Sequence, residues 1–269
     1  MAVAAVALVA AAPAPAGAAE AREFVVATSP VGWTPGVASA RAYAASRAGT
    51  VAFAVRTERG VRGRLADMTF PSASVVKAML LVAYLRQPAV RRRALTGAER
   101  DMLGPMVRWS SNDDASRVFV ALGAARLSRF ASRAGMRRFT ADPWWGRSRI
   151  TARDQTRFFL AADRLVPRRH REYAMDLLAG IVPSQRWGVG RAVPRGWRVH
   201  FKGGWGSGRG LVDHQVALLV RGRQRVAVAV LTLGNPDHAY GMRTLEGVFR
   251  RLLRGLEGSL RARWRGAAP

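Results

Sequence analysis

The sequence predicts an α/β protein of the α+β type, with one antiparallel sheet flanked by N- and C-terminal helices and an inserted all-helical lobe. Apolar and polar residues alternate toward both ends of the chain, at 50–70 and 197–235, which is the period of a β-strand. Between these segments, apolar residues recur at helical spacing. A single sheet built from both ends of the chain, with helices between, fits this order.

The N-terminal part contains a helix and a hairpin. GVASARAYAASRA (36–48) is rich in alanine and predicts a helix. TVAFAVRTERG (50–60) alternates, ends in glycine and is followed at once by VRGRLADMTF (61–70), which is typical of a β-hairpin. Residues 74–86 then change to helical spacing, with apolar side chains at Val75, Val76, Met79, Leu80 and Ala83.

The middle of the chain predicts a block of helices. A capping box, Thr96 with Glu99, opens the helix in LTGAERDMLGPMV. Residues 114–135 and 151–166 are amphipathic and predict one helix each, the second capped by Thr151. REYAMDLLAGIV (171–182) predicts another helix.

The period returns to two after residue 195. WRVHFKGGW, LVDHQVALLVRG and QRVAVAVLTLGN predict three successive strands, and TLEGVFRRLLRGLEGSL (244–260) predicts a closing helix. We therefore expect a single domain at 20–269, with an α/β lobe at 36–76 and 195–262 and a helical lobe at 77–194.

The first 19 residues, MAVAAVALVAAAPAPAGAA, carry no charged side chain. An apolar run followed by small residues is typical of a secretory signal, although Lys and Arg are missing from its start. This segment predicts a signal peptide cleaved near Ala18, and hence a secreted or cell-envelope protein.

Charge and composition narrow the function classes. The chain contains no cysteine, which excludes disulfides, thiolate metal sites and cysteine nucleophiles. The formal net charge is +27. An anionic partner would explain it, but arginines are scattered along the chain, which favours compositional drift over a nucleic-acid footprint.

Lysine is almost absent from this cationic chain. Of 44 basic residues only two are lysines, Lys77 and Lys202. Arginine stays protonated near neutral pH, whereas a desolvated lysine can release its proton. A lysine retained where arginine serves everywhere else is therefore a candidate proton-transfer group.

Both lysines fall in short motifs. FPSASVVKAML contains Ser74 three residues before Lys77, so both side chains share one face at the start of a helix. MVRWSSNDDAS contains a Ser-x-Asn triplet at Ser110 and Asn112, and HFKGGWG contains a Lys-x-Gly triplet at Lys202. Each motif alone also fits a helix cap or a surface cation.

The three motifs in the order SxxK, SxN and KxG resemble those of the penicillin-recognising serine hydrolases, in particular their class A β-lactamase-like branch. The resemblance runs from about residue 36 to about residue 260. It implies a β-lactamase/transpeptidase-like fold and implies a serine that attacks an amide carbonyl.

The resemblance also implies the residue roles. Ser74 would be the nucleophile, Lys77 would take its proton, and Ser110 would pass a proton to the departing nitrogen. Lys202 would anchor a substrate carboxylate and help to lower the pKa of Lys77. The substrate-binding residues would be Asn112 for the amide side arm, the Gly203–Gly204 pair of the strand, and Trp205, whose backbone N–H would complete an oxyanion hole with that of Ser74.

Three departures from the family pattern concern the cleft. No glutamate occurs in 139–157, where the deacylating glutamate would lie, and the nearest acid, Asp142, also fits a turn before Pro143. Gly203 replaces the usual hydroxyl residue, for which Ser207 is a candidate substitute. The segment between the first two motifs is also shorter than usual, which alters one wall.

Two histidines and several tryptophans are further candidate site residues. His200 and His214 lie in adjacent predicted strands but lack a third metal ligand at a suitable spacing, so neither a metal nor a cofactor is expected. Trp144, Trp145 and Trp205 fit either a cleft lining or core packing. Trp187 is interpreted as structural.

The sequence thus predicts a serine hydrolase acylated at Ser74 by a β-lactam or a peptidoglycan-like amide, with slow deacylation. A D-Ala-D-Ala carboxypeptidase of the penicillin-binding type and a non-catalytic cell-wall-binding relative are the alternatives. We expect a small-molecule or peptidoglycan-like substrate, weak contact with anionic cell-wall polymers, no specific nucleic acid and a monomer.

Overall fold

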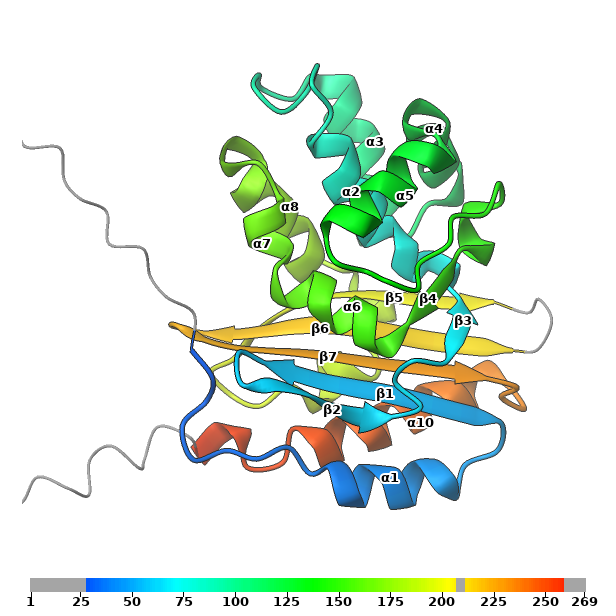
Figure 1. The fold of residues 1–269 in the computed structure, drawn as a ribbon, viewed down its shortest axis with the longest axis vertical. Helices are drawn as coiled ribbons and strands as arrows, with labels where there is room; N and C mark the ends of the chain where they lie inside the picture. The colour runs from blue at the N-terminus through cyan, green and yellow to red at the C-terminus, as the bar shows by residue number, and fades with distance from the viewer. Residues whose placement is uncertain (1–27, 207–210, 259–269) are drawn as a thin grey trace, which may run out of the picture.

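The computed structural model describes residues 28–206 and 211–258 and confirms the predicted fold class (Figure 1). A five-stranded antiparallel sheet has the order β2-β1-β7-β6-β5. Its strands are β1 (Thr50–Thr57), β2 (Gly60–Arg64), β5 (Arg198–Gly206), β6 (Val212–Arg221) and β7 (Gln224–Leu233). The predicted hairpin and the three predicted C-terminal strands are therefore present. The leader and its cleavage position lie outside the described residues.

Helices cover both faces of this sheet (Figure 1). The helices α1 (Val37–Ala45) and α10 (His238–Leu252) lie on one face. On the other face α6 (Ala152–Leu160) packs on the central strands and the helical lobe rises beyond it. Because both faces are covered, β6 and β7 are buried along most of their length.

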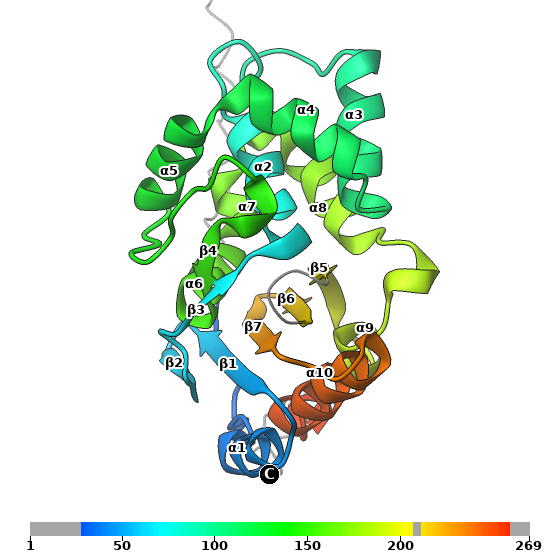
Figure 2. The same ribbon diagram turned by 90° about the vertical axis from the view of Figure 1, so that its right-hand side faces the viewer.

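The helical lobe is arranged around α2 (Val76–Leu85), whose side chains are all buried (Figure 2). A helix that is apolar all round belongs inside a domain. Its neighbours in the lobe are α3 (Gly97–Arg108), α4 (Asn112–Leu122), α5 (Ala124–Arg133) and α8 (Arg171–Ala179), and α7 (Ala162–Leu165) packs against α8. The short helix α9 (Val189–Ala192) lies against α10. The capping box at Thr96 is present as predicted.

Three helix predictions were wrong in their bounds. The segment 114–135 is two helices, because Gly123 adopts a φ of 74° and turns the chain between α4 and α5. The segment 151–166 is interrupted at Ala161, between α6 and α7. The closing helix begins at His238 instead of 244, because the Asp237 side chain accepts a hydrogen bond from the Tyr240 backbone N–H.

A small second sheet was not predicted. It pairs β3 (Thr69–Pro71) with β4 (Arg149–Thr151), strands too short to show a period. This ladder ties the segment before Ser74 to the end of the 142–148 loop. In the part of the chain that the structure describes, no helix combines the length and the apolar character needed to cross a bilayer.

Candidate active site

Ser74 lies where strand β3 passes into helix α2. It belongs to a short 3-10 helix, η1 (Ala73–Val75), that leads directly into α2. The preceding residue, Ala73, has a φ of 43°, which is unusual for a residue with a side chain. The turn is held from outside, because the backbone N–H of Ser72 donates to Ser148 O at 2.7 Å. A strained turn held by its surroundings is typical of a functional position.

His214 supports the same turn from strand β6. Its ring is fully buried, and the backbone N–H of Thr232 donates to Nδ1 at 3.1 Å. Nδ1 is then the acceptor, so Nε2 carries the proton and donates to Pro71 O at 2.9 Å. Burial lowers the pKa of His214 to about 4. A neutral imidazole thus fixes the chain three residues before the candidate nucleophile.

Ser110 lies in the turn between α3 and α4. Its φ is 63°, and the next residue, Ser111, caps α4 by accepting from Asp114 N. The predicted cap at this triplet is therefore present, but it is made by Ser111 and leaves the Ser110 side chain free for the site. Ala73 and Ser110 are two of the three residues other than glycine with positive φ in the described chain. Backbone strain thus concentrates next to the candidate catalytic serines.

Both lysines point into this site and are fully buried. The ammonium of Lys77 donates to Ser110 O, to Ser110 Oγ at 3.2 Å and to Asn112 Oδ1 at 2.8 Å. Lys202, on the edge strand β5, donates to the same Ser110 Oγ at 3.0 Å and to Gly203 O at 2.9 Å. Two amines from different lobes therefore converge on one hydroxyl group.

Burial changes the charge of these amines. It lowers the pKa of Lys77 to about 7, against a smaller opposing effect of Asp114. Burial and then repulsion from Lys77 hold the pKa of Lys202 well below its ordinary value. The lowered pKa of Lys77 is thus caused mainly by burial and not by the nearby Lys202. At neutral pH the site holds amines that can accept a proton, which arginine could not do.

Strand β5 runs very close to the start of the Ser74 helix. A Cβ on Gly204 would lie 2.7 Å from Ser74 N and 2.8 Å from Val75 N, so only glycine fits between them. This approach brings the strand that carries Trp205 beside the N–H groups of the turn. At Gly203 a Cβ would meet the Trp187 ring at 3.5 Å, an ordinary contact with little room for a larger side chain.

A cavity of about 710 Å³ opens over Ser74. Its lining combines Ser74 and Asn112 with Trp205 and Gly206 of β5 and with the 142–149 loop. Asp142 is the carboxylate of this lining, and its Oδ1 accepts from Trp144 N at 2.7 Å. Asp142 therefore makes the turn that the sequence indicated.

Trp145 covers Lys77. The lysine Nζ lies 4.7 Å from the centre of the Trp145 ring, and the indole N–H donates to Ser116 Oγ at 3.1 Å. Of the three tryptophans considered as a cleft lining, Trp145 and Trp205 line the cavity, whereas Trp144 is 70% exposed. An aromatic face, instead of a carboxylate, thus lies against the candidate base.

Sequence analysis missed a cluster beside Trp205. The His238 ring stacks on Trp205 with centroids 5.7 Å apart, and His238 Nδ1 lies 2.5 Å from Asp213 Oδ1. Trp187 packs edge-on against both rings. Asp213 is almost fully buried, and burial raises its pKa to about 6 although His238 opposes the shift. The sequence did contain a signal for this cluster, because Asp213 is an acidic residue within a largely apolar strand.

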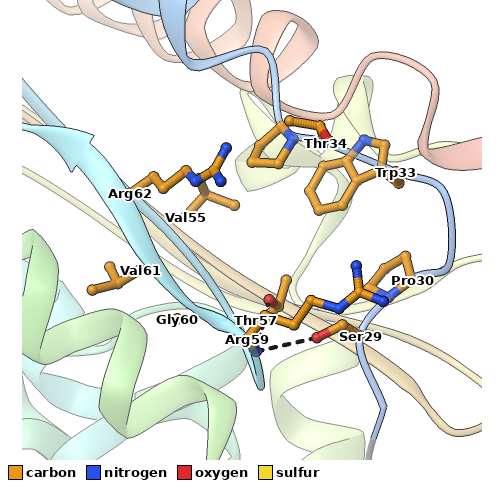
Figure 3. Close-up of a pocket in the computed structure, with 11 residues that line it drawn as sticks. Ser29, Pro30, Trp33, Thr34, Val55, Thr57, Arg59, Gly60, Val61 and Arg62 are labelled. Atoms are coloured by element: carbon orange, nitrogen blue, oxygen red, sulfur yellow. Dashed lines mark hydrogen bonds between the residues drawn. The ribbon is translucent and has the colours of Figure 1, made fainter.

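His200 and a second cavity show no sign of a metal or substrate site. His200 Nδ1 lies 2.9 Å from Met175 O on the helical lobe, away from His214. A second cavity of about 210 Å³ lies between the N-terminal segment and the β1–β2 hairpin (Figure 3). Ser29 Oγ there accepts from Arg59 N, and the lining offers no carboxylate, histidine or lysine. This second cavity therefore offers none of the proton-transfer groups that lie beside Ser74.

Every predicted site residue therefore has a definite place. Lys77, Ser110, Asn112 and Lys202 form one hydrogen-bonded group, and Ser74 lines the adjoining cavity with Trp205. The described residues contain no hydrogen bond between Lys77 and Ser74, because the lysine is directed at the Ser110 turn. Gly204 allows β5 to approach the Ser74 turn, and Gly203 lies beside the Trp187 ring. Ser207 lies outside the described residues.

Replacing Gly204 by alanine is expected to separate β5 from the Ser74 turn. The added Cβ would meet backbone atoms, which cannot move aside cheaply, so we expect a loss of about 1–3 kcal/mol in the free energy of unfolding. The rate of any acylation at Ser74 should fall about 100-fold, because a small misplacement of reacting groups is costly. Urea unfolding and acylation kinetics measure the two effects.

Gly206→Ala is the matched control for stability on the same strand, since a Cβ there meets no atom within 4 Å. Equal stability of the two alanine variants would contradict the close approach at Gly204.

Comparisons with known proteins agree with this geometry. The family model described as "Beta-lactamase enzyme family" matches residues 106–251, which is more than half of the chain. A comparison with curated proteins found no match. Among solved structures, a β-lactamase from Sphaerobacter thermophilus has a TM-score of 0.71 at 21% identity, over 82% of this chain and 97% of that one.

Two further solved structures show the same fold. A class A β-lactamase from Mycobacterium abscessus has a TM-score of 0.69 at 21% identity, over 81% of this chain and 98% of that one. An ancestral class A β-lactamase has a TM-score of 0.66 at 20% identity, over 79% and 96%. The chain therefore belongs to the β-lactamase enzyme family and is a serine hydrolase with the fold of the class A enzymes.

Proposed function

We propose that Ser74 takes up the acyl group of a β-lactam or a peptidoglycan-like amide and that the acyl-enzyme is hydrolysed slowly. The observation that carries this proposal is the shared hydrogen-bonded group of Lys77, Ser110 and Lys202 beside the Ser74 cavity. Two amines with lowered pKa values around one hydroxyl group are arranged for proton transfer.

In the acylation step, Ser74 Oγ attacks the carbonyl carbon and its proton passes to the neutral amine of Lys77. The carbon–nitrogen bond then breaks, and Ser110 Oγ gives its proton to the leaving nitrogen. Ser110 regains a proton from the protonated Lys77, so the charges balance over the step. The backbone N–H groups of Ser74 and Trp205 would stabilise the oxyanion, each worth about 3–4 kcal/mol.

Lys202 and Asn112 would bind the substrate. Two amines that share one hydroxyl oxygen repel each other when both are charged, which favours the neutral form of one of them. A substrate carboxylate near Lys202 would favour its charged form and leave Lys77 as the base. Asn112 Oδ1 accepts from Lys77 in the described structure, and its amide N–H₂ remains the donor for a side arm.

The lining near Lys77 supports slow hydrolysis of the acyl-enzyme. Release needs a base that activates water. Trp145 lies against Lys77, and Asp142 already accepts a hydrogen bond within its own turn. A peptidase of the D-Ala-D-Ala carboxypeptidase type remains the alternative, because the same lining would suit an enzyme that transfers or releases a peptide acyl group slowly.

Benzylpenicillin is expected to give a burst of about one equivalent of opened ring, followed by slow turnover. Asp142→Ala should leave the slow phase unchanged within about twofold, because its carboxylate belongs to the turn. Stopped-flow absorbance measures both phases, and D-alanine release from a D-Ala-D-Ala peptide tests the alternative. If turnover shows no burst and is abolished in Asp142→Ala, then Asp142 activates the water and the proposal of slow hydrolysis is contradicted.

Three features of the wider biological setting are proposed from the sequence. We propose a small-molecule or peptidoglycan-like substrate, export directed by the N-terminal segment, and a monomer. The net charge of +27 supports weak contact with anionic cell-wall polymers.

A further inference from the structure

A cavity of about 250 Å³ lies at the opposite end of α2 from Ser74. It is formed by the end of α2, the loop that follows and helix α5, and its floor includes the buried ring of Phe130. Since α2 has ten residues that rise about 1.5 Å each, the cavity lies about 15 Å from the candidate nucleophile along the helix. It is therefore separate from the cleft.

Five arginines line this cavity. Three of them, Arg126, Arg129 and Arg133, are spaced i, i+3 and i+7 on α5 and so share one face of that helix. The other two, Arg86 and Arg91, come from the end of α2 and the loop behind it. Arginines from two separate elements thus border the same cavity.

No acidic side chain balances these charges. The segments 68–98 and 115–141, which supply the whole lining, contain no Asp or Glu, although the chain has 17 of them. Arg86 donates to the backbone of Leu165, and Arg126 donates to Gln87. Within the described residues, Arg91, Arg129 and Arg133 have neither a hydrogen bond nor an ion pair from their side chains.

Another cavity lined by arginines shows what a balanced arrangement looks like. The cavity that contains Arg198 and Arg225 also contains Asp176 and Asp163, which form ion pairs with them. The cavity between α2 and α5 differs from it in having no acidic residue in its lining, and it brings together more arginines than the acid-free cavity of Figure 3, which contains two. Arg86 and Arg133 gain stability from nearby helix C-termini, but Arg129 lies one turn inside α5, where the helix dipole contributes little.

We propose that this cavity binds a phosphate-ester group. Like charges four residues apart on a helix destabilise it, and an anion between them would remove that cost. Planar guanidinium groups match the oxygens of a phosphate two at a time, and several of them around one cavity suit a multiply charged group such as a diphosphate. The site needs no chemistry at Ser74, so it is independent of the proposed acylation.

Isothermal titration with pyrophosphate at physiological ionic strength tests this site. The wild type should bind, and the triple variant Arg91→Gln/Arg129→Gln/Arg133→Gln should bind at least about tenfold more weakly. The matched control is Arg59→Gln/Arg62→Gln/Arg195→Gln, which removes the same charge from exposed positions elsewhere, two of them at the cavity of Figure 3. With a Debye length of about 8 Å, the control should lose less than about twofold.

Vesicles of phosphatidylglycerol identify the source of the phosphate. Vesicle binding that pyrophosphate displaces, and that the cavity variant alone loses, would indicate a lipid headgroup. Pyrophosphate binding without vesicle binding would indicate a small ligand. The proposal is wrong if the wild type does not bind pyrophosphate, or if both triple variants weaken binding equally while their melting temperatures match that of the wild type.

Discussion

Replacing Lys77 by arginine is expected to lower the rate constant for Ser74 acylation by about 10³-fold. The Lys77 amine is buried with a pKa of about 7, so about half of the molecules carry it neutral at pH 7. A guanidinium keeps its proton at this pH, and a positioned base contributes about 10²–10⁴-fold to such a step. Mass spectrometry of the adduct against time gives the rate constant.

The pH dependence of the wild type provides the internal check. The fraction of neutral Lys77 falls from about one half at pH 7 to about one hundredth at pH 5, so acylation at pH 5 should be about 50-fold slower than at pH 7. Lys77→Arg should show no such dependence. Arg108→Lys is a conservative exchange at the exposed end of α3, and it should acylate at the wild-type rate. An arginine variant that keeps more than about a tenth of the wild-type rate would contradict the role of Lys77 as base.

Mild acid is expected to destabilise the fold through His214. Its pKa is about 4 in the folded protein and about 6.5 in the unfolded chain, so the unfolded chain binds the proton first as the pH falls. The stabilisation is complete above pH 6.5 and is lost between pH 6.5 and pH 4. The free energy of unfolding should fall by about 3 kcal/mol over this window, as measured by urea unfolding.

Burial also lowers the pKa of His200, so that residue adds a smaller part of the same loss, whereas Glu99 and Asp213 act in a different range or with the opposite sign. Hydrogen bonds from Arg93 lower the pKa of Glu99 to about 2, so its stabilisation is lost mainly below pH 4. The pKa of Asp213 is raised, so protonating it favours the folded state as the pH falls. His214→Gln should therefore flatten the curve, whereas His200→Gln should leave most of the slope. A slope unchanged in His214→Gln would contradict the assignment.

The elements of the fold follow largely from local pattern. Alternation predicted β1, β2 and the three C-terminal strands, and the capping side chains of Thr96 and Thr151 marked two helix starts. Helix ends were less predictable, because Gly123 can turn the chain inside a continuous amphipathic pattern. The β3–β4 pair depends on contacts between distant segments and has no local signal.

The site was predictable in its residue types but not in its contacts. Scarcity of lysine singled out Lys77 and Lys202, and both are buried in the cleft. That Lys77 contacts the Ser110 turn depends on how α2 packs against α4, which no spacing along the chain reveals. The stacking of His238 on Trp205 likewise joins segments more than 30 residues apart.

Peptide mapping by mass spectrometry after exposure to benzylpenicillin tests the central claim most directly. The wild type should carry one penicilloyl group, on the peptide that contains Ser74, and Ser74→Ala should carry none while remaining folded. An unmodified wild type, or an adduct that persists in Ser74→Ala, would contradict the assignment of Ser74 as the nucleophile.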